Sequence, residues 1–463
     1  MDILIINPGK GASGQKSEHL GIAYLKSYVV SRGFTADIID MIIEEITLRD
    51  TVNKIIKIKP KALGISLVDA SKKKGLALIK SVRRAGYQGS IILGGYFATF
   101  SSREILRDFP EIDYVVRGEG ELILAELLEV IINKKDIALT DILGLSFRKN
   151  SKIIENPAQT LIKNLDILPP PDRKYAAVTI KNKSPLRINA TRGCWGKCAF
   201  CDIIRFYAAS NGKRWRRRSA KNVVDEIEQL MEKFNTNYFI FNDDQFLVKG
   251  RRGAEYVNEF VHELESRDLN ISFELMCRAD TIQYDIIAQL KSAGLKRIFL
   301  GLESFDSEQL RRFGKGISVR QNLKAVIILN KLKVDVIASV ILADAYTTLG
   351  DLVKQLIALF ELRRRYFNGK HCLISINKRL EIYRGSVVYQ QYRAQGLLTR
   401  DDYLRGYAYK LHLGTTLRLW LLTLEENIIK LLFNPGKVLT NLLPIIRLRY
   451  HTFKALITTG AKF

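Results

Sequence analysis

The chain has 463 residues, of which 47% are hydrophobic and 26% are charged. It is long enough for two domains with sizeable cores, and its composition excludes a disordered chain. The formal net charge of +25 favours an anionic partner, such as nucleic acid, a membrane surface, an acidic peptide or a phosphorylated cofactor. The charge does not choose among them, and a solvated basic surface accounts for it equally well.

Cysteine usage and the N-terminus indicate the compartment. Five cysteines are too few for a disulfide scaffold, and three of them lie between residues 194 and 201, which is typical of metal binding in a reducing environment. The opening MDILIINPGK lacks the basic start and cleavage site of a secretory signal. No stretch approaches the roughly 18 uninterrupted apolar residues of a membrane span. We therefore expect a cytoplasmic protein.

Strand and helix patterns alternate over residues 1–140, which predicts a doubly wound, Rossmann-like α/β domain. Short apolar runs separated by helical periodicity are typical of a parallel sheet covered on both faces. The runs that we interpret as strands are 3–7, 36–41, 62–68, 90–95 and 113–121.

A boundary follows at residues 141–183. This segment holds a small polar hairpin and then the run DILPPPDRKY (166–175), whose three prolines cannot lie inside a helix or a central strand. Alternation resumes over residues 184–380, and repeated strand–helix units predict a full or partial β/α barrel. Its expected strands are 187–193, 237–244, 271–277, 297–304, 336–342 and 372–378. We expect a helical, basic C-terminal region at 381–463.

The cluster motif is TRGCWGKCAFC, in which Cys194, Cys198 and Cys201 have C-x3-C-x2-C spacing. They follow the first barrel strand, so they lie at the barrel face that carries chemistry. Thiolates are the expected ligands of iron–sulfur clusters. Three thiolates on a four-iron cubane leave one iron open for a cofactor or substrate. A structural zinc site is the alternative, but zinc prefers closed four-ligand sites, and neither a second cysteine pair nor a nearby histidine is present.

This motif resembles the signature of radical S-adenosylmethionine (SAM) enzymes, in which the open iron binds SAM and one electron releases a 5′-deoxyadenosyl radical. The resemblance implies that Phe200 lies against the adenine, although a core aromatic is the alternative. It implies that Asp243 and Asp244, in FNDDQF, meet the amino group of SAM, although an Asx turn would also account for them. Further SAM-binding residues implied by the family's pattern are Arg218, Arg278, Glu303 and Ser304.

The sequence does not determine two parts of the expected SAM pocket, namely the role of Glu303 and the contacts made after the next strand. Glu303 suits a buried ion pair equally well. The next strand departs from the G-x-P-G-E-T pattern of many relatives, because it reads ILADAYTTLGDL (341–352) with Asp344, Thr347 and Thr348 in place of the proline and glutamate. The sequence therefore does not identify the residues that contact the adenine side of the cofactor.

The N-terminal domain resembles that of the cobalamin-binding-domain subgroup of the same family. The matching pieces include HLGIAYLKSYVVSRGF (19–34), GISL, LGGYFAT and VVRGEGE. Ligands of doubly wound sheets lie beyond the carboxyl ends of the strands, and the resemblance places the cobalamin contacts there, at Ser66, Leu67, Gly94, Gly95 and Glu119.

Two departures accompany that resemblance. The chain has no D-x-H-x-x-G motif to offer a cobalt ligand, and Phe97 stands where many relatives have histidine after the paired glycines. A domain that only shapes the substrate channel is the alternative to cobalamin binding.

Two basic segments add further expectations. GKRWRRRS (212–219) would steer an anionic substrate or hold the SAM carboxylate through Arg218, or it is a solvated loop. Every charged side chain of residues 427–463 is basic. That tail would lie on an anionic membrane surface or, as we prefer, pack as a helical cap over the barrel.

The resemblance implies an enzyme with a 4Fe-4S cluster, SAM and cobalamin as cofactors. The reaction that we favour is C-methylation of an unactivated carbon in a natural product, a peptide or a lipid. Radical cyclisation, rearrangement or oxidation without methyl transfer, and RNA modification, are the alternatives. We expect an anionic substrate and an external electron donor of the flavodoxin or ferredoxin type. The sequence shows no nucleic-acid module.

Overall fold

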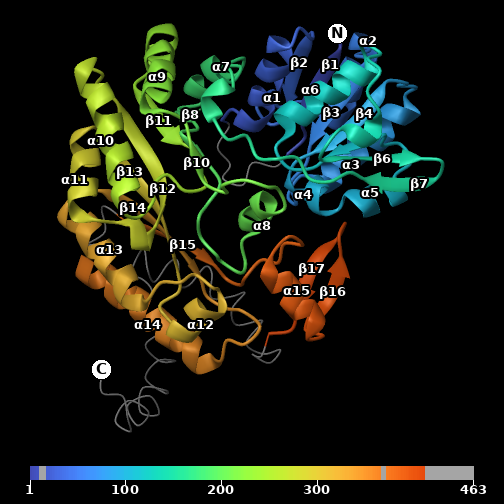
Figure 1. Cartoon of the computed structure of the whole chain (residues 1–463). Coiled ribbons are helices and arrows are strands. Elements are labelled where there is room, and N and C mark those ends of the chain that lie inside the picture. The colour runs from blue at the N-terminus through green and yellow to red at the C-terminus, as the bar shows by residue number, and fades with distance from the viewer. Residues whose placement is uncertain (10–16, 367–371, 412–463) are drawn as a thin grey trace.

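The computed structural model describes residues 1–9, 17–366 and 372–411 (Figure 1). Its first sheet has the order β2-β1-β3-β4-β5-β6-β7. The parallel strands are β1 (Ile3–Asn7), β2 (Ala36–Asp40), β3 (Ala62–Ser66), β4 (Ser90–Gly94) and β5 (Tyr114–Val116). The central strands β1, β3, β4 and β5 are mostly apolar because helices cover both faces of the sheet, whereas the edge strand β2 contains two aspartates.

The helices of this domain divide between the two faces of the sheet. One hydrophobic cluster contains residues of α1 (Leu20–Ser31) and α6 (Gly120–Ile131). The other contains residues of α2 (Leu48–Ile58), α3 (Lys72–Arg84), α4 (Tyr96–Phe100) and α5 (Ser102–Asp108). The predicted doubly wound arrangement is confirmed.

The five strands predicted within residues 1–140 are parallel, as expected, and the small hairpin predicted after them joins the same sheet. The hairpin β6 (Leu145–Lys149) and β7 (Lys152–Glu155) extends it in the antiparallel sense, through β5. Phe147 of β6 is buried in the domain core, so the hairpin completes the first domain.

The second sheet has the order β15-β14-β13-β12-β11-β8, and every pairing in it is parallel. Because β8 and β15 are its two edges, the barrel is partial. Its strands are β8 (Leu186–Ile188), β11 (Tyr238–Phe241), β12 (Ser272–Arg278), β13 (Leu295–Glu303), β14 (Asp335–Ile341) and β15 (Cys372–Asn377).

Helices alternate with these strands along the chain and are coloured from green to orange in Figure 1. They are α9 (Ala220–Phe234), α10 (Arg251–Ser266), α11 (Tyr284–Ser292), α12 (Ser307–Arg312), α13 (Val319–Lys331) and α14 (Leu349–Tyr366). Two shorter helices, α7 (Ala176–Lys181) and α8 (Asp202–Ala208), flank β8 and the cluster loop, and the two-residue strands β9 (Thr191–Arg192) and β10 (Arg216–Arg217) pair antiparallel. Single 3-10 turns occur at Leu139–Asp141, Leu165–Ile167 and Ala279–Thr281.

The described part of the C-terminal region contains one helix, α15 (Val387–Ala394), followed by an antiparallel hairpin of β16 (Leu398–Asp402) and β17 (Gly406–Tyr409). The sequence pattern does not predict this hairpin. The segment lies below α4 and α5 in Figure 1 and contacts α5 through an ion pair of Arg384 with Glu104 and a hydrogen bond from Tyr403 to Asp108.

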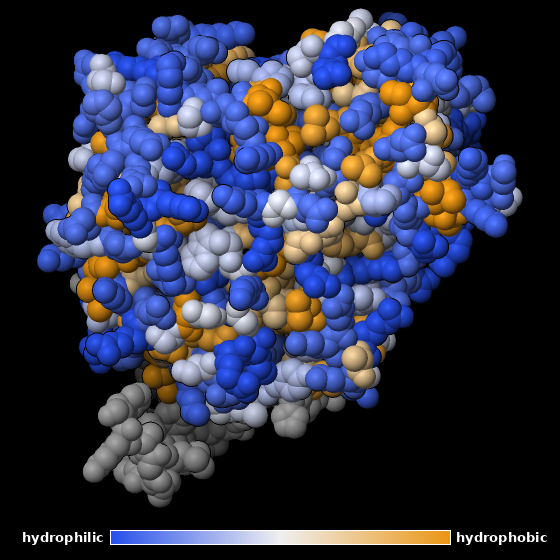
Figure 2. Space-filling view, viewed as in Figure 1, coloured by the Kyte–Doolittle hydropathy of each residue, from blue (hydrophilic) through white to orange (hydrophobic). Residues whose placement is uncertain are grey.

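Both interpretations of the basic tail, a helical cap and a membrane contact, concern residues outside the described ranges. Among the residues that are described, no helix combines the length and apolar content needed to cross a membrane. On the face shown in Figure 2, hydrophilic residues predominate and apolar residues form separate patches.

Candidate active site

The three cysteines lie on a loop between β9 and α8, at the carboxyl end of the first barrel strand. The loop starts at Gly193, where φ is +81° and a Cβ atom would lie 1.9 Å from the carbonyl oxygen of Arg214, so only glycine fits there. At its other end the Ala199 amide donates to Phe313, and the Val388 amide donates to Ala199. The cluster loop is therefore held by the barrel and by α15.

Hydrogen-bond donors surround the thiols. Nη1 of Arg278 lies 3.2 Å from Sγ of Cys198, and the Gly196 amide nitrogen lies 3.3 Å from Sγ of Cys194. Burial raises the pKa of Cys194 and of Cys201 above the ordinary thiol value, so donors and metal are needed to hold them as thiolates. Hydrogen bonds to cluster sulfurs are what an iron–sulfur site requires.

Arg278 is fixed in that place by three other contacts. Its guanidinium pairs with Asp280 at 3.0 Å, donates to the Lys315 carbonyl at 2.5 Å and lies over the ring of Trp195. In the described chain, no three His, Cys, Asp or Glu side chains converge on one metal ion. A cubane does not need that convergence, because each of its thiolates binds a different iron.

Asp243 and Asp244 follow β11 and face the start of the cluster loop. Oδ1 of Asp243 accepts from the amides of Ala190 and Thr191, both at 2.9 Å, while its Oδ2 is buried without a partner. Oδ2 of Asp244 accepts from the Gly193 amide at 3.1 Å. Burial raises the pKa of Asp243 to about 7 and that of Asp244 to about 6. An ammonium group at this position would complete the missing hydrogen bond and restore both charges.

The remaining predicted SAM contacts lie beside the same loop or at the next strand end. Phe200 packs edge-on against Phe313, at 5.4 Å between ring centroids. Glu303 ends β13 and pairs with Lys315, whose Nζ lies 2.6 Å from Oε1; this is the buried ion pair that the sequence left open. Ser304 is fully buried, and its hydroxyl accepts from the Asp306 amide. Lys315 carries no sequence signal of its own.

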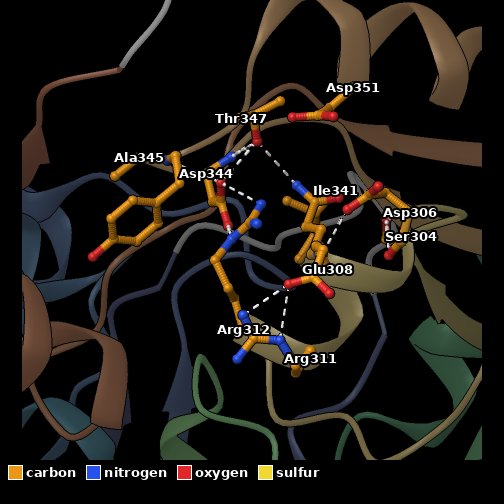
Figure 3. Close-up of polar contacts among 12 residues, drawn as sticks. Ser304, Asp306, Glu308, Arg311, Arg312, Ile341, Asp344, Ala345, Thr347 and Asp351 are labelled. Atoms are coloured by element: carbon orange, nitrogen blue, oxygen red, sulfur yellow. Dashed lines mark hydrogen bonds and ion pairs between the residues drawn. The ribbon is translucent and has the colours of Figure 1, made fainter.

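The loop after β14, where the chain departs from its relatives, is closed by internal polar contacts (Figure 3). Asp344 accepts from Nε of Arg312 at 2.7 Å and from the Thr347 hydroxyl at 2.7 Å, and it also accepts from the Tyr346 amide. Asp344 and Thr347 are both 1% exposed. These residues therefore shape their own turn, which leaves the adenine-side contacts to other groups.

A cavity lies where the two domains meet, at the carboxyl ends of the first sheet's strands. Ser66, Gly94, Gly95 and Glu119, four of the five predicted cobalamin contacts, line it, and so does Asp244 from the barrel. A Cβ atom on Gly94 would meet no atom closer than 3.8 Å, so this glycine leaves free room on the cavity side. Gly95 has φ of +91° and lies against the Leu67 backbone. Leu67 itself is buried against Gly75 and does not line the cavity.

Glu119 also forms ion pairs between the two domains. Its carboxylate pairs with Arg216 at 2.7 Å and with Arg192 at 3.3 Å, and Arg192 also pairs with Glu121 at 2.6 Å. Although burial opposes it, the two arginines lower the pKa of Glu119. Charges from the two domains thus neutralise each other along one wall of the cavity.

Within the basic segment 212–219, Arg216 and Arg218 are buried and paired with Glu119 and Glu226, so the interpretation as a solvated loop is wrong for these two arginines. Arg217 pairs with Glu259 at 2.6 Å. Arg218 is the predicted SAM contact that the structure does not bring to the cluster loop. Its guanidinium donates to Glu226, to Asn222 and to the Asn189 carbonyl.

The cavity lining also includes residues that the sequence did not single out, among them His19, Tyr96 and Tyr207. His19 precedes α1, Tyr96 follows the paired glycines, and Tyr207 lies in α8 close to the cluster loop. Tyr96 packs on Phe206, at 4.4 Å between centroids. Aromatic residues beside glycines at strand ends are the signal that would have identified Tyr96. His19 opens the run 19–34, which resembles the cobalamin-binding subgroup, but nothing in that run singled out its side chain.

Two segments of the chain match known protein families. Residues 9–128 match the family model of the B12 binding domain, and residues 188–356 match that of the radical SAM superfamily. The chain is a radical SAM enzyme with a B12-binding domain. The two matched segments contain the cavity-lining strand ends and the cluster loop, respectively.

Relatives and solved structures agree with this assignment. An uncharacterised methyltransferase of Pyrococcus horikoshii is 29% identical over 74% of either chain. An anaerobic magnesium-protoporphyrin IX monomethyl ester cyclase of Rubrivivax gelatinosus is 27% identical, over 71% of this chain and 60% of the cyclase. The cobalamin-dependent radical SAM enzyme OxsB, with aqua-cobalamin and SAM bound, superposes with a TM-score of 0.74 at 22% identity, over 89% of this chain and 64% of OxsB.

A second solved structure has the same fold. The radical SAM methyltransferase TsrM of Kitasatospora setae, with cobalamin and a [4Fe-4S] cluster, gives a TM-score of 0.70 at 16% identity, over 87% of this chain and 80% of TsrM. The cofactors of the family are thus a 4Fe-4S cluster, SAM and cobalamin. The residues of this chain fit them: three thiols with hydrogen-bond donors, a buried unpaired carboxylate oxygen for an ammonium, and a glycine-lined cavity for a corrin.

Proposed function

We propose that this enzyme transfers a methyl group from cobalamin to an unactivated carbon after reductive cleavage of SAM. The observation that carries the proposal is the shared cavity, whose wall includes Gly94 and Glu119 from the first domain and Asp244 from the barrel. When bound, the cluster and SAM supply a 5′-deoxyadenosyl radical and cobalamin supplies a methyl carrier, and a shared cavity lets one substrate carbon reach both.

The residues of the chain would bind SAM and hold the cluster loop in place. Asp243 and Asp244 would receive the ammonium of SAM, because one buried carboxylate oxygen lacks a partner. Arg278 donates to the Cys198 sulfur and holds the cluster loop against Asp280. Tyr96 of α4 packs on Phe206 of α8, which packs on Tyr207, and the three rings form an aromatic wall of the cavity. That wall would exclude water from the reacting groups.

Radical cyclisation or rearrangement without methyl transfer is the second candidate. It is favoured by two kinds of relative, the cyclase of Rubrivivax gelatinosus and a 4′-phospho-dehydrooxetanocin synthase of Priestia megaterium at 26% identity over 64% of this chain. Methyl transfer is favoured by the methyltransferase of Pyrococcus horikoshii and by a hopanoid C-3 methylase of Methylococcus capsulatus, 27% identical over 54% of this chain.

The substrate and the partners follow from charge and chemistry. The net charge of +25 supports an anionic small molecule or peptide as substrate. Cleavage of SAM needs one electron, so an external donor of the flavodoxin or ferredoxin type would serve the cluster. Ligand thiols must stay reduced, which supports a cytoplasmic location.

The test is anaerobic reconstitution with iron, sulfide and methylcobalamin, followed by reduction in the presence of SAM. We expect about four irons per chain, release of 5′-deoxyadenosine, and retention of the corrinoid through gel filtration. The Cys198→Ala variant should lose iron and 5′-deoxyadenosine release, while Cys372→Ala, on the far edge strand, should keep both. Cleavage of SAM without corrinoid retention would favour the second candidate.

A further inference from the structure

His19 is a cavity residue whose hydrogen bonding fixes the state of its ring. It precedes α1 as its N-terminal cap, and the Ile22 amide donates to Nδ1 at an N–N distance of 3.3 Å. Because Nδ1 accepts, the proton of the neutral imidazole resides on Nε2. The ring is therefore a hydrogen-bond donor at Nε2, without a free lone pair there.

The Nε2–H donor of His19 has no acceptor among the described residues. No described residue accepts a hydrogen bond from Nε2, and His19 lines the same cavity as Ser66 and Gly94. Asp40, whose charge acts on His19, already accepts from Nδ2 of Asn7 and from the amides of Ile42 and Ile43. Burial lowers the pKa of His19, so the ring stays neutral and carries one proton.

We propose that Nε2 of His19 donates a hydrogen bond to the cobalamin bound in this cavity and does not ligate the cobalt. Corrin side chains end in amides, whose carbonyl oxygens accept such a bond, and a water on the cobalt would accept it equally well. Ligation would need the lone pair of Nε2 and hence a proton on Nδ1. That proton would oppose the Ile22 N–H and break the cap of α1. The proposal rests on the proposed function, since it requires cobalamin in the cavity.

The experiment compares three chains loaded anaerobically with hydroxocobalamin. His19→Ser removes the donor but keeps a cap acceptor for the Ile22 amide, whereas His19→Ala removes both. We expect both variants to bind hydroxocobalamin more weakly, by about two- to tenfold in Kd, the range of one neutral hydrogen bond. Iron content should be unchanged in both, because the cluster loop belongs to the other domain. Full affinity in His19→Ser with a loss only in His19→Ala would overturn the donor role and leave the cap alone.

Ligation is tested separately by paramagnetic resonance of the reduced, cob(II)alamin-loaded protein. We expect its spectrum to be identical whether the protein's histidines carry ¹⁴N or ¹⁵N. A change from triplet to doublet superhyperfine splitting on ¹⁵N-histidine labelling would overturn the proposal, because it would place a histidine nitrogen on cobalt. Failure of the unaltered chain to retain any corrinoid would remove both this proposal and cobalamin-dependent methyl transfer, whereas the first two outcomes leave the proposed function standing.

Discussion

Replacing Asp243 by asparagine should make stability less sensitive to pH. The carboxyl is 2% exposed, and burial raises its pKa from 3.8 to about 7. A carboxyl whose pKa is higher in the folded chain stabilises the fold while it is protonated, and that contribution is lost as pH rises from about 4 to about 7. A shift of about three units corresponds to about 4 kcal/mol, at 1.36 kcal/mol per unit.

Asparagine reproduces the geometry without the charge. Its oxygen can accept from the Ala190 and Thr191 amides, and its amide nitrogen takes the place of the unpartnered Oδ2. We therefore expect the free energy of unfolding of Asp243→Asn, relative to that of the unaltered chain, to rise by up to about 4 kcal/mol between pH 4 and pH 8. The sign, and not the absolute stability of the variant, is the prediction.

The assay is urea unfolding of the cluster-free protein under reducing conditions, followed by tryptophan fluorescence. Trp195 and Trp215 donate to the carbonyls of Leu247 and Gln245, so both report on the loop that holds Asp243. Asp225→Asn is the control, because nearby lysine and arginine lower the pKa of Asp225. A difference between Asp243→Asn and the unaltered chain that stays constant over this pH range would refute the reasoning.

Three further predictions concern stability and cofactor retention. Arg312→Ala leaves the buried carboxylate of Asp344 without its arginine and should lower the free energy of unfolding in urea by about 3–5 kcal/mol. Arg311→Ala removes an exposed ion pair and should lower it by less than about 1 kcal/mol. Equal losses in the two variants would contradict the burial argument. Glu119→Gln should lower the unfolding midpoint, because it removes the carboxylate partner of Arg216 and one of the two partners of Arg192. Gly94→Val should fold and bind iron but lose hydroxocobalamin during gel filtration, while Gly95→Ala should be unstable because its Cβ would lie 2.5 Å from a carbonyl oxygen; retained corrinoid in Gly94→Val would mean that the cavity is not the site.

The sequence predicted what local patterns determine. Every strand of the barrel was anticipated, because each is a short run rich in apolar residues between two helical segments. The spacing of Cys194, Cys198 and Cys201 identified the chemistry, since all three ligands lie on one loop.

What escaped prediction depends on distant partners. Arg216 and Arg217 looked like part of a solvated or steering segment, yet their carboxylates come from Glu119 and Glu259, far away in the sequence. Arg218 pairs with Glu226, which lies eight residues further along the chain in α9. The β16–β17 hairpin is short and largely polar, so it lacks the alternation that marks a strand. His19 opens the matched run 19–34, but its side chain reaches the cavity only through the position of α1, which the run itself does not determine.

The charges at the cavity wall also bear on how such enzymes can be recombined. Glu119 and Glu121 belong to the N-terminal unit, while their arginine partners, Arg192 and Arg216, belong to the barrel. A chimera that joins this barrel to an N-terminal unit with neutral residues at 119 and 121 would bury two uncompensated cations beside the corrin. The two halves therefore form a matched pair, and substrate range is better altered within one half than by exchanging them.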